Sequence, residues 1–179
     1  MQTARMMIPA DRISYRMLVP AVALMLVLFA FPLHAQRTSD RGSPFAGLAG
    51  NWSGTGTITL ASGATERIRC RATYAVSSAG TDLQQMLRCA SDSYNFDLRS
   101  TVAYEGGAIR GTWTETARNA SGTVSGRAGS GGVEANVVGP NFSAGLTVSI
   151  RGDRQAVTIT PSQGSALTQA SISLARTPR

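Results

Sequence analysis

The fold is decided by residues 65–91, which read TERIRCRATYAVSSAGTDLQQMLRCAS. Apolar and polar residues alternate on both sides of a Ser-Ala-Gly-Thr segment, which is typical of two antiparallel strands joined by a short turn. If the chain reverses at the Ala79–Gly80 bond, one register puts the apolar residues of both strands on one face and Cys70 opposite Cys89. A slip of one residue would break both agreements, so the stretch predicts a β-hairpin with a defined register.

The two cysteines of this hairpin, Cys70 and Cys89, are the only cysteines of the chain. Directly opposed residues in an antiparallel pair have Cα atoms about 4.5 to 5.5 Å apart, which a disulfide accepts. We therefore predict a Cys70–Cys89 disulfide. The alternative, a free thiol that acts as a nucleophile, is disfavoured because the chain outside its leader offers no His to activate it.

The same alternation extends outward along the rest of the chain. Short alternating runs recur about every ten to twelve residues between Gly, Ser, Asn and Asp clusters, as in all-β proteins. Inward rows begin at Trp52, Ile68, Leu83, Tyr94 and Ile109, and further strands are expected near 121–127, 132–138, 142–151, 154–160 and 166–176. The pattern predicts an all-β antiparallel up-and-down meander of nine or ten strands that closes into a barrel, which leaves no exposed edge.

The first 35 residues have the pattern of a secretory signal peptide. Three Arg precede an apolar run from Leu18 to Phe31, then Pro32 and a small residue, Ala35, at the expected cleavage site. The prediction is a helical signal peptide over 1–35, a polar tether over 36–47 and a single barrel domain over 48–179. The protein is then periplasmic or secreted, without a lipid anchor, since no Cys lies near the cut. An uncleaved anchor is the alternative, but the run of about 14 residues is shorter than the roughly 20 that span a bilayer.

Composition excludes several kinds of chemistry. All 17 basic residues are Arg, and the single His, His34, lies in the leader. Removal of residues 1–35 takes away three Arg and one acid, leaving a net charge of +5 and no His. This excludes Schiff-base lysines, His-based triads and His-ligated zinc or haem. Asp97, Glu115 and Glu134 have no spacing that brings two carboxylates together. We expect no enzyme, no cofactor and no metal site.

The segment Gly50–Gly56, GNWSGTG, opens the first expected strand. It resembles the G-x-W start of calycin-type barrels, such as lipocalins, fatty-acid-binding proteins and nitrobindin-like domains. Gly111–Glu115, GTWTE, is a second, weaker match. The resemblance implies a closed barrel with a Trp at one end and a cavity for a small apolar ligand. The haem-binding His of nitrobindin-like domains and the Arg–Tyr pair of fatty-acid binders have no counterpart here.

A set of polar and aromatic residues is expected to project into the barrel. Buried Trp and Tyr side chains present polar tips that need partners, so the set could line a ligand pocket or simply fill a packed core. An inward carboxylate requires an Arg, a hydrogen-bond donor or a ligand. The ligand-lining candidates are Trp52, Tyr74, Gln85, Tyr94, Phe96, Trp113 and Glu115.

A basic outer face is expected on the same hairpin. It carries Arg67, Arg69, Arg71 and Arg88, with Arg71 directly opposite Arg88. Opposed like charges repel, so the face indicates an anionic envelope component or an acidic protein, unless nearby carboxylates or solvent satisfy it. Nucleic acid is disfavoured because no aromatic residues are interleaved. Charged outer rows and few aromatics also argue against a barrel embedded in a membrane, so no membrane span is expected after cleavage.

Two functions remain open at this stage. The first is an exported binding protein that carries or senses a small apolar ligand in its interior. The second is a periplasmic interaction protein, similar to a protease inhibitor or an envelope-associated module, with a packed core and a basic outer face.

Overall fold

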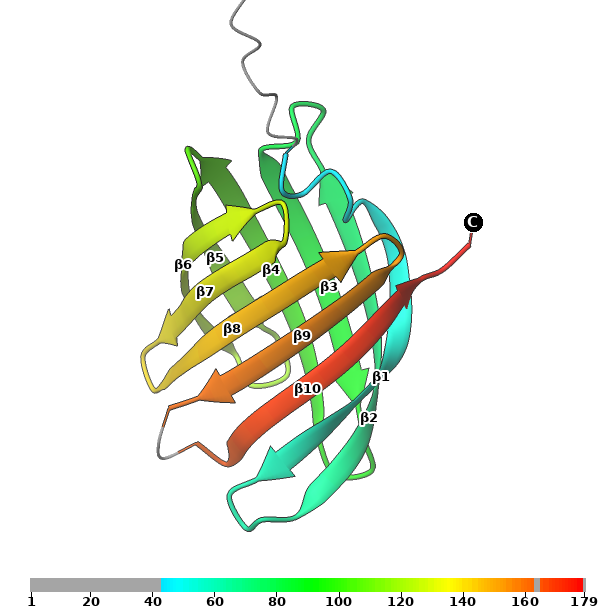
Figure 1. Cartoon of the computed structure of the whole chain (residues 1–179). Helices are drawn as coiled ribbons and strands as arrows, with labels where there is room; N and C mark the ends of the chain where they lie inside the picture. The colour runs from blue at the N-terminus through cyan, green and yellow to red at the C-terminus, as the bar shows by residue number, and fades with distance from the viewer. Residues whose placement is uncertain (1–42, 163–164, 179) are drawn as a thin grey trace, which may run out of the picture. The chain divides into compact units, whose positions relative to one another are not determined.

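The computed structural model describes residues 43–162 and 165–178. These residues form ten antiparallel strands that close into a barrel, as the sequence predicts (Figure 1). The expected signal peptide and residues 36–42 of the expected tether lie outside the described residues. The strands are β1 (Gly50–Leu60), β2 (Thr65–Val76), β3 (Asp82–Ala90), β4 (Asn95–Glu105), β5 (Ala108–Glu115), β6 (Ala120–Gly129), β7 (Gly132–Gly139), β8 (Phe142–Arg151), β9 (Arg154–Pro161) and β10 (Leu167–Arg176).

The topology is an up-and-down meander. Each strand pairs with its neighbours in the sequence, and β1 pairs with β10 to close the sheet. Inward and outward residues alternate along the strands, because successive side chains of a strand point to opposite faces. The alternation is interrupted at the start of β10, where a register shift leaves both Leu167 and Ala170 buried. On β2, Ile68, Cys70, Ala72 and Tyr74 are buried, and the residues between them are exposed.

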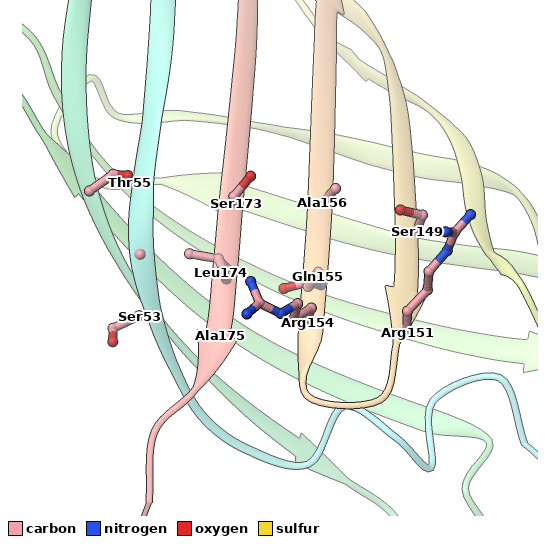
Figure 2. A pocket seen from close by; sticks show the side chains of 11 residues that line it. Ser53, Thr55, Ser149, Arg151, Arg154, Gln155, Ala156, Ser173, Leu174 and Ala175 are labelled. Carbon is pink, nitrogen blue, oxygen red and sulfur yellow. The ribbon is translucent and has the colours of Figure 1, made fainter.

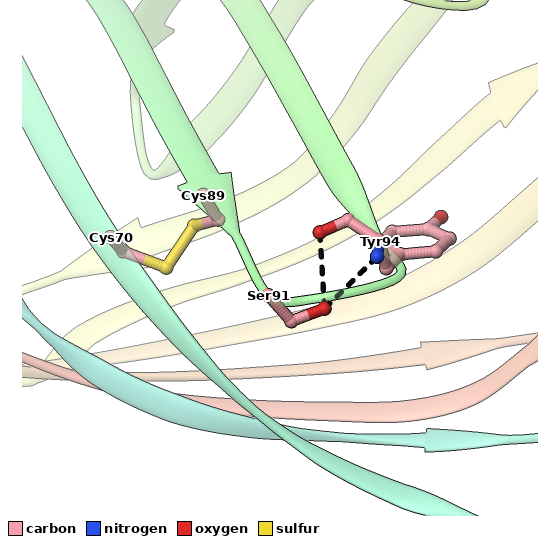
Figure 3. Close-up of a disulfide and its surroundings, with 4 residues drawn as sticks. All are labelled: Cys70, Cys89, Ser91 and Tyr94. Carbon is pink, nitrogen blue, oxygen red and sulfur yellow. Dashed lines mark hydrogen bonds between the residues drawn. A yellow bond between two sulfur atoms is a disulfide. The ribbon is translucent and has the colours of Figure 1, made fainter.

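The β2–β3 hairpin has the predicted register. Cys70 lies opposite Cys89 and Val76 lies opposite Leu83. The two cysteines form a disulfide with a Cα–Cα distance of 4.1 Å, and both are buried on the inner side (Figure 3). Within the described residues there is no free cysteine.

Two inward glycines lie where neighbouring strands approach closely. A Cβ atom at Gly54 would overlap the carbonyl oxygen of Ser173 on β10, and one at Gly122 would overlap that of Val138 on β7. Glycine at such positions allows a sheet to bend sharply, which a closed barrel requires. The glycines that interrupt the inner rows therefore contribute to closure.

Residues 43–49 cover one end of the barrel. Phe45 and Leu48 are buried, and the Phe45 ring makes an edge-to-face contact with Tyr104, with centroids 6.2 Å apart. Phe45 belongs to the range 36–47 that the sequence analysis treats as a tether. The difference arises because a single Phe between Pro44 and Ala46 shows no periodicity, so the sequence pattern does not predict its packing.

Candidate functional site

Trp52 belongs to the covered end of the barrel and is 1% exposed. Its Nε1 donates a hydrogen bond to the carbonyl oxygen of Leu48 at 2.8 Å, and its ring meets that of Tyr74 edge to face. The Arg176 guanidinium lies 4.6 Å from the Trp52 ring centroid and is also bonded to Asp153 at 2.8 Å. Trp52 is thus surrounded by other residues of the protein. Its hydrogen bond to Leu48 holds residues 43–49 against the barrel.

Two polar pairs lie inside the barrel. The Tyr74 hydroxyl donates to Oε1 of Gln155 at 3.0 Å, and the Ser100 hydroxyl donates to Oε1 of Gln85 at 3.0 Å. Burial raises the pKa of Tyr74 to about 12, and the bond to Gln155 opposes that rise only in part. Tyr74 therefore stays neutral at physiological pH. Both pairs satisfy interior polar groups in the absence of any ligand.

The inner row of β4 is buried in the middle of the strand and partly accessible toward both ends, with Tyr104 packed against Phe45 at the covered end. Ser100 and Val102 are buried, whereas Phe96 and Leu98 are partly exposed although they project inward. Tyr94, one inward position further along, is also partly exposed. These inward apolar side chains therefore keep accessible surface at the end opposite residues 43–49.

Other inner rows show the same incomplete burial. Partly buried hydrophobic residues of β8 and β9 pack against the core without being fully covered. Gln85, in the middle of β3, is also only partly buried. The accessible inward surface of these strands comprises Leu146, Val148, Ile150 and Ile159. The interior wall is therefore largely apolar with two polar pairs, which suits a small apolar or amphiphilic molecule.

Tyr94, Phe96 and Arg118 border this open end. The Tyr94 and Phe96 rings meet edge to face with centroids 6.3 Å apart, and the Arg118 guanidinium lies 4.4 Å from the Tyr94 ring centroid. Arg118 also donates to the carbonyl oxygen of Asn95 at 2.8 Å. The turn before β4 is fixed by Ser91, whose hydroxyl bonds to the backbone N and O of Tyr94 (Figure 3). The result is a rim with one fixed cation beside two aromatic rings.

Glu115 does not face a ligand space. Its carboxylate accepts hydrogen bonds from the backbone N–H groups of Asp97 at 3.0 Å, Ala117 at 3.2 Å and Arg118 at 2.6 Å. The Arg118 guanidinium adds an ion pair at 3.7 Å. The inward carboxylate has found hydrogen-bond donors and an Arg within its own turn, so it stabilises the β5–β6 connection.

Trp113 lies on the barrel wall, where it packs between neighbouring strands. Its Nε1 donates to the carbonyl oxygen of Val138 at 3.2 Å, and its ring meets Phe142 edge to face with centroids 6.0 Å apart. A Cβ atom at Gly139 would collide with the indole ring. The absence of a side chain at Gly139 makes room for Trp113.

The seven inward candidates do not form one cluster. Trp52 and Tyr74 belong to the covered end, Gln85 pairs with Ser100, and Trp113 packs on Phe142. Tyr94, Phe96 and Glu115 gather at the open end. The sequence analysis missed Arg118 and Gln155, because each acquires its role from a partner that the hydrophobic pattern does not reveal.

The outer basic face has the predicted arrangement on β2 and β3. Arg71 lies opposite Arg88, and Arg67, Arg69, Arg71 and Arg88 are all exposed. Arg88 forms an ion pair with Asp97 at 2.7 Å. Glu66 is occupied by hydrogen bonds from Ser91 and Ser93, which hold its pKa below the usual value. One of the four arginines is thus paired with a carboxylate.

Two features of the described residues concern metal and cofactor binding. No three His, Cys, Asp or Glu side chains gather there as a metal site would require. Every buried side-chain nitrogen or oxygen in that part of the chain has a hydrogen-bond partner. The described region also contains no helix that is long and apolar enough to cross a membrane.

The closed ten-strand meander with Trp52 at its covered end defines a calycin-like barrel. Its fold is similar to that in the crystal structure of Rv2717c from M. tuberculosis, with a TM-score of 0.60 and 12% identity over 74% of this chain and 94% of that chain. It is also similar to the S-type phycobiliprotein lyase CPES from Guillardia theta, with a TM-score of 0.51 and 11% identity over 75% of this chain and 91% of that one. No protein-family model matches the chain, and no curated protein matches its sequence.

Proposed function

We propose that the chain is an exported binding protein whose barrel interior takes a small amphiphilic ligand through the end bordered by Tyr94, Phe96 and Arg118. The observation that carries the proposal is the inner row of β4, where inward apolar side chains remain partly accessible toward that end. The ligand's apolar part would lie against Leu98 and the accessible wall of β8 and β9. An anionic head would lie beside the Arg118 guanidinium, which can donate charge-assisted hydrogen bonds to it.

Binding without catalysis is part of the proposal. The interior polar groups are two neutral pairs, and neither pair contains a nucleophile next to a base. The similarity to a phycobiliprotein lyase supports a ligand-holding barrel. The disulfide supports export, because such bonds persist in oxidising compartments.

The experiment is a titration of the purified, delipidated protein with dodecanoate and with dodecanol, monitored by Trp fluorescence. Saturable changes with both are expected, and Arg118→Gln should weaken dodecanoate about tenfold while leaving dodecanol unchanged. Arg110→Gln, an exposed position on β5, makes the same charge change away from the site. Absence of saturation with both amphiphiles would refute the proposal.

A second variant tests the space itself. Leu98→Trp should fill the open end, abolish binding of both amphiphiles and leave the thermal midpoint nearly unchanged. If the interior is packed instead, the larger ring costs about 1 to 3 kcal/mol of stability. Thr101→Trp is the matched control, because Thr101 is exposed on the outer side of the same strand. A destabilised Leu98→Trp protein that binds no amphiphile would favour the interaction-protein alternative.

A further inference from the structure

The outer surface carries a depression of about 430 Å³ over β1, β8, β9 and β10. It lies on the outer side of the sheet, because most of the side chains that line it occupy outward positions of these strands. The inward residues Gly54, Gln155 and Leu174 also border it. Arg154 extends toward β10, and Arg151 extends along β8 toward Ser149 (Figure 2). The remaining outward residues that line it are small, namely Ser53, Thr55, Ser149, Ala156, Ser173 and Ala175.

The strand register places this depression within a longer row of arginines. Each residue of the row lies directly opposite the next on the neighbouring strand, from β8 to β3. The row, which we call the arginine row, consists of Arg151, Arg154, Ala175, Ser53, Arg71 and Arg88. Two arginine pairs thus flank two small residues, with Arg154 and Arg71 three strand spacings apart, or about 14 Å.

The charges of the row are largely uncompensated. Among the described residues, ion pairs join Arg88 to Asp97 and Arg176 to Asp153, and none involves Arg71, Arg151 or Arg154. Asp153 lies in the turn between Arg151 and Arg154 but bonds to Arg176 instead. Like charges directly opposed across strands are destabilising, so a bound anion would relieve both pairs.

The chemistry of the depression narrows the class of anion. Guanidinium groups bind phosphate and carboxylate groups through paired hydrogen bonds. The four hydroxyl residues that line the depression can donate to and accept from sugar hydroxyls. None of the lining residues is aromatic, so bases of a single-stranded nucleic acid would find no stacking surface. The row also follows a curved surface across six of the ten strands, which a flexible chain can follow and a flat membrane cannot (Figure 1).

We propose that the arginine row is a binding site for an anionic glycan, a saccharide chain whose carboxylate or phosphate groups bridge the two arginine pairs. The hydroxyls of the depression hold the sugar units between them. The site is independent of the interior site, because its residues point to the opposite side of the sheet. The outcome of its test is therefore independent of the outcome of the amphiphile titration.

The test is calorimetric titration of the full chain with oligogalacturonate, with its uncharged methyl ester and with inorganic polyphosphate. The expected result is saturable binding of oligogalacturonate and none of the ester. Arg71→Gln and Arg154→Gln should each weaken oligogalacturonate about tenfold. Arg110→Gln, an exposed arginine of β5 outside the row, should change it less than about twofold.

Three outcomes would overturn the proposal. Equal weakening by Arg110→Gln would mean attraction by net charge alone. Binding of polyphosphate as tight as or tighter than that of oligogalacturonate would mean that the sugar hydroxyls contribute nothing. Absence of oligogalacturonate binding would refute the proposed glycan site. Both row positions are exposed, so thermal midpoints of the unliganded variants should equal or exceed that of the unchanged protein, which checks that folding is intact.

Discussion

Breaking the Cys70–Cys89 link should remove about 3 kcal/mol from the free energy of unfolding. The two residues are 19 apart in the sequence, and the chain-entropy model assigns this value to a closed loop of that length. For a domain of this size, such a loss lowers the thermal midpoint by roughly 10 °C. The loss has this size because the bond restricts the unfolded chain, whereas the β2–β3 ladder persists in the folded protein without it.

The measurement is denaturant unfolding followed by circular dichroism, with and without dithiothreitol. Comparing the oxidised and reduced forms of the unchanged protein gives the contribution of the disulfide bond to the free energy of unfolding. Comparing the reduced protein with Cys70→Ala/Cys89→Ala isolates the packing of two sulfurs that are 2% and 3% exposed. Dithiothreitol should have no effect on the double variant.

Two results would refute this prediction. If the oxidised and reduced proteins unfold at the same denaturant concentration, the loop-entropy account fails. If non-reduced peptide mapping finds both thiols free in protein from an oxidising compartment, the hairpin register fails with it.

Three further outcomes are expected. The free energy of unfolding should fall by about 2 kcal/mol as pH rises from 10 to 12, because the unfolded chain loses the Tyr74 proton near 10 while the native protein keeps it until about 12. Tyr74→Phe should lack this slope, and equal slopes in both proteins would contradict the prediction. Phe45→Ala should lower the free energy of unfolding by about 3 kcal/mol, measured by denaturant unfolding. Ala46→Ser, a substitution at the exposed neighbouring residue, should change it little. An unchanged midpoint of the Phe45→Ala protein would mean that residues 43–49 do not pack against the barrel in solution. Glu115→Ala should lower the free energy of unfolding by about 2 kcal/mol, because three backbone N–H groups lose their hydrogen-bond acceptor. Glu134→Ala, at an exposed position of β7, is the control. Equal effects of the two substitutions would rule out the turn-stabilising role of Glu115.

The alternation of side chains was sufficient to predict the strands and their inner rows. Within the β2–β3 hairpin it also fixed the register, because the turn, the apolar face and the pairing of Cys70 with Cys89 all agreed. Local hairpins are predictable in this way since both partners lie within one short stretch of sequence.

The contacts that give individual side chains their roles could not be predicted from the sequence in the same way. Tyr74 meets Gln155 from 81 residues away, and Arg154 joins the row of Arg71 only through the β1–β10 pairing. Neither follows from periodicity, because alternation fixes which face a residue occupies and not which distant strand lies beside it. Glu115 was predicted to face inward, but its partners depend on the conformation of the following turn. That conformation includes a positive φ at Asn119, which a pattern of apolar residues does not encode.

The barrel is closed by the pairing of β1 with β10, the two strands that lie farthest apart in the sequence. Nine strand pairs join chain neighbours, and the tenth brings Trp52 to Arg176. Closing a loop of roughly 120 residues costs about 4 kcal/mol of chain entropy, far more than any hairpin turn, so this junction should form last in folding. The position of the junction is nevertheless arbitrary. The N–H of Thr177 bonds to the carbonyl oxygen of Asn51 at 2.8 Å, so both strand ends lie together. A circularly permuted chain, joined there by a short linker and opened at the β7–β8 turn, would turn the old junction into a hairpin and make β7–β8 the last pair to close.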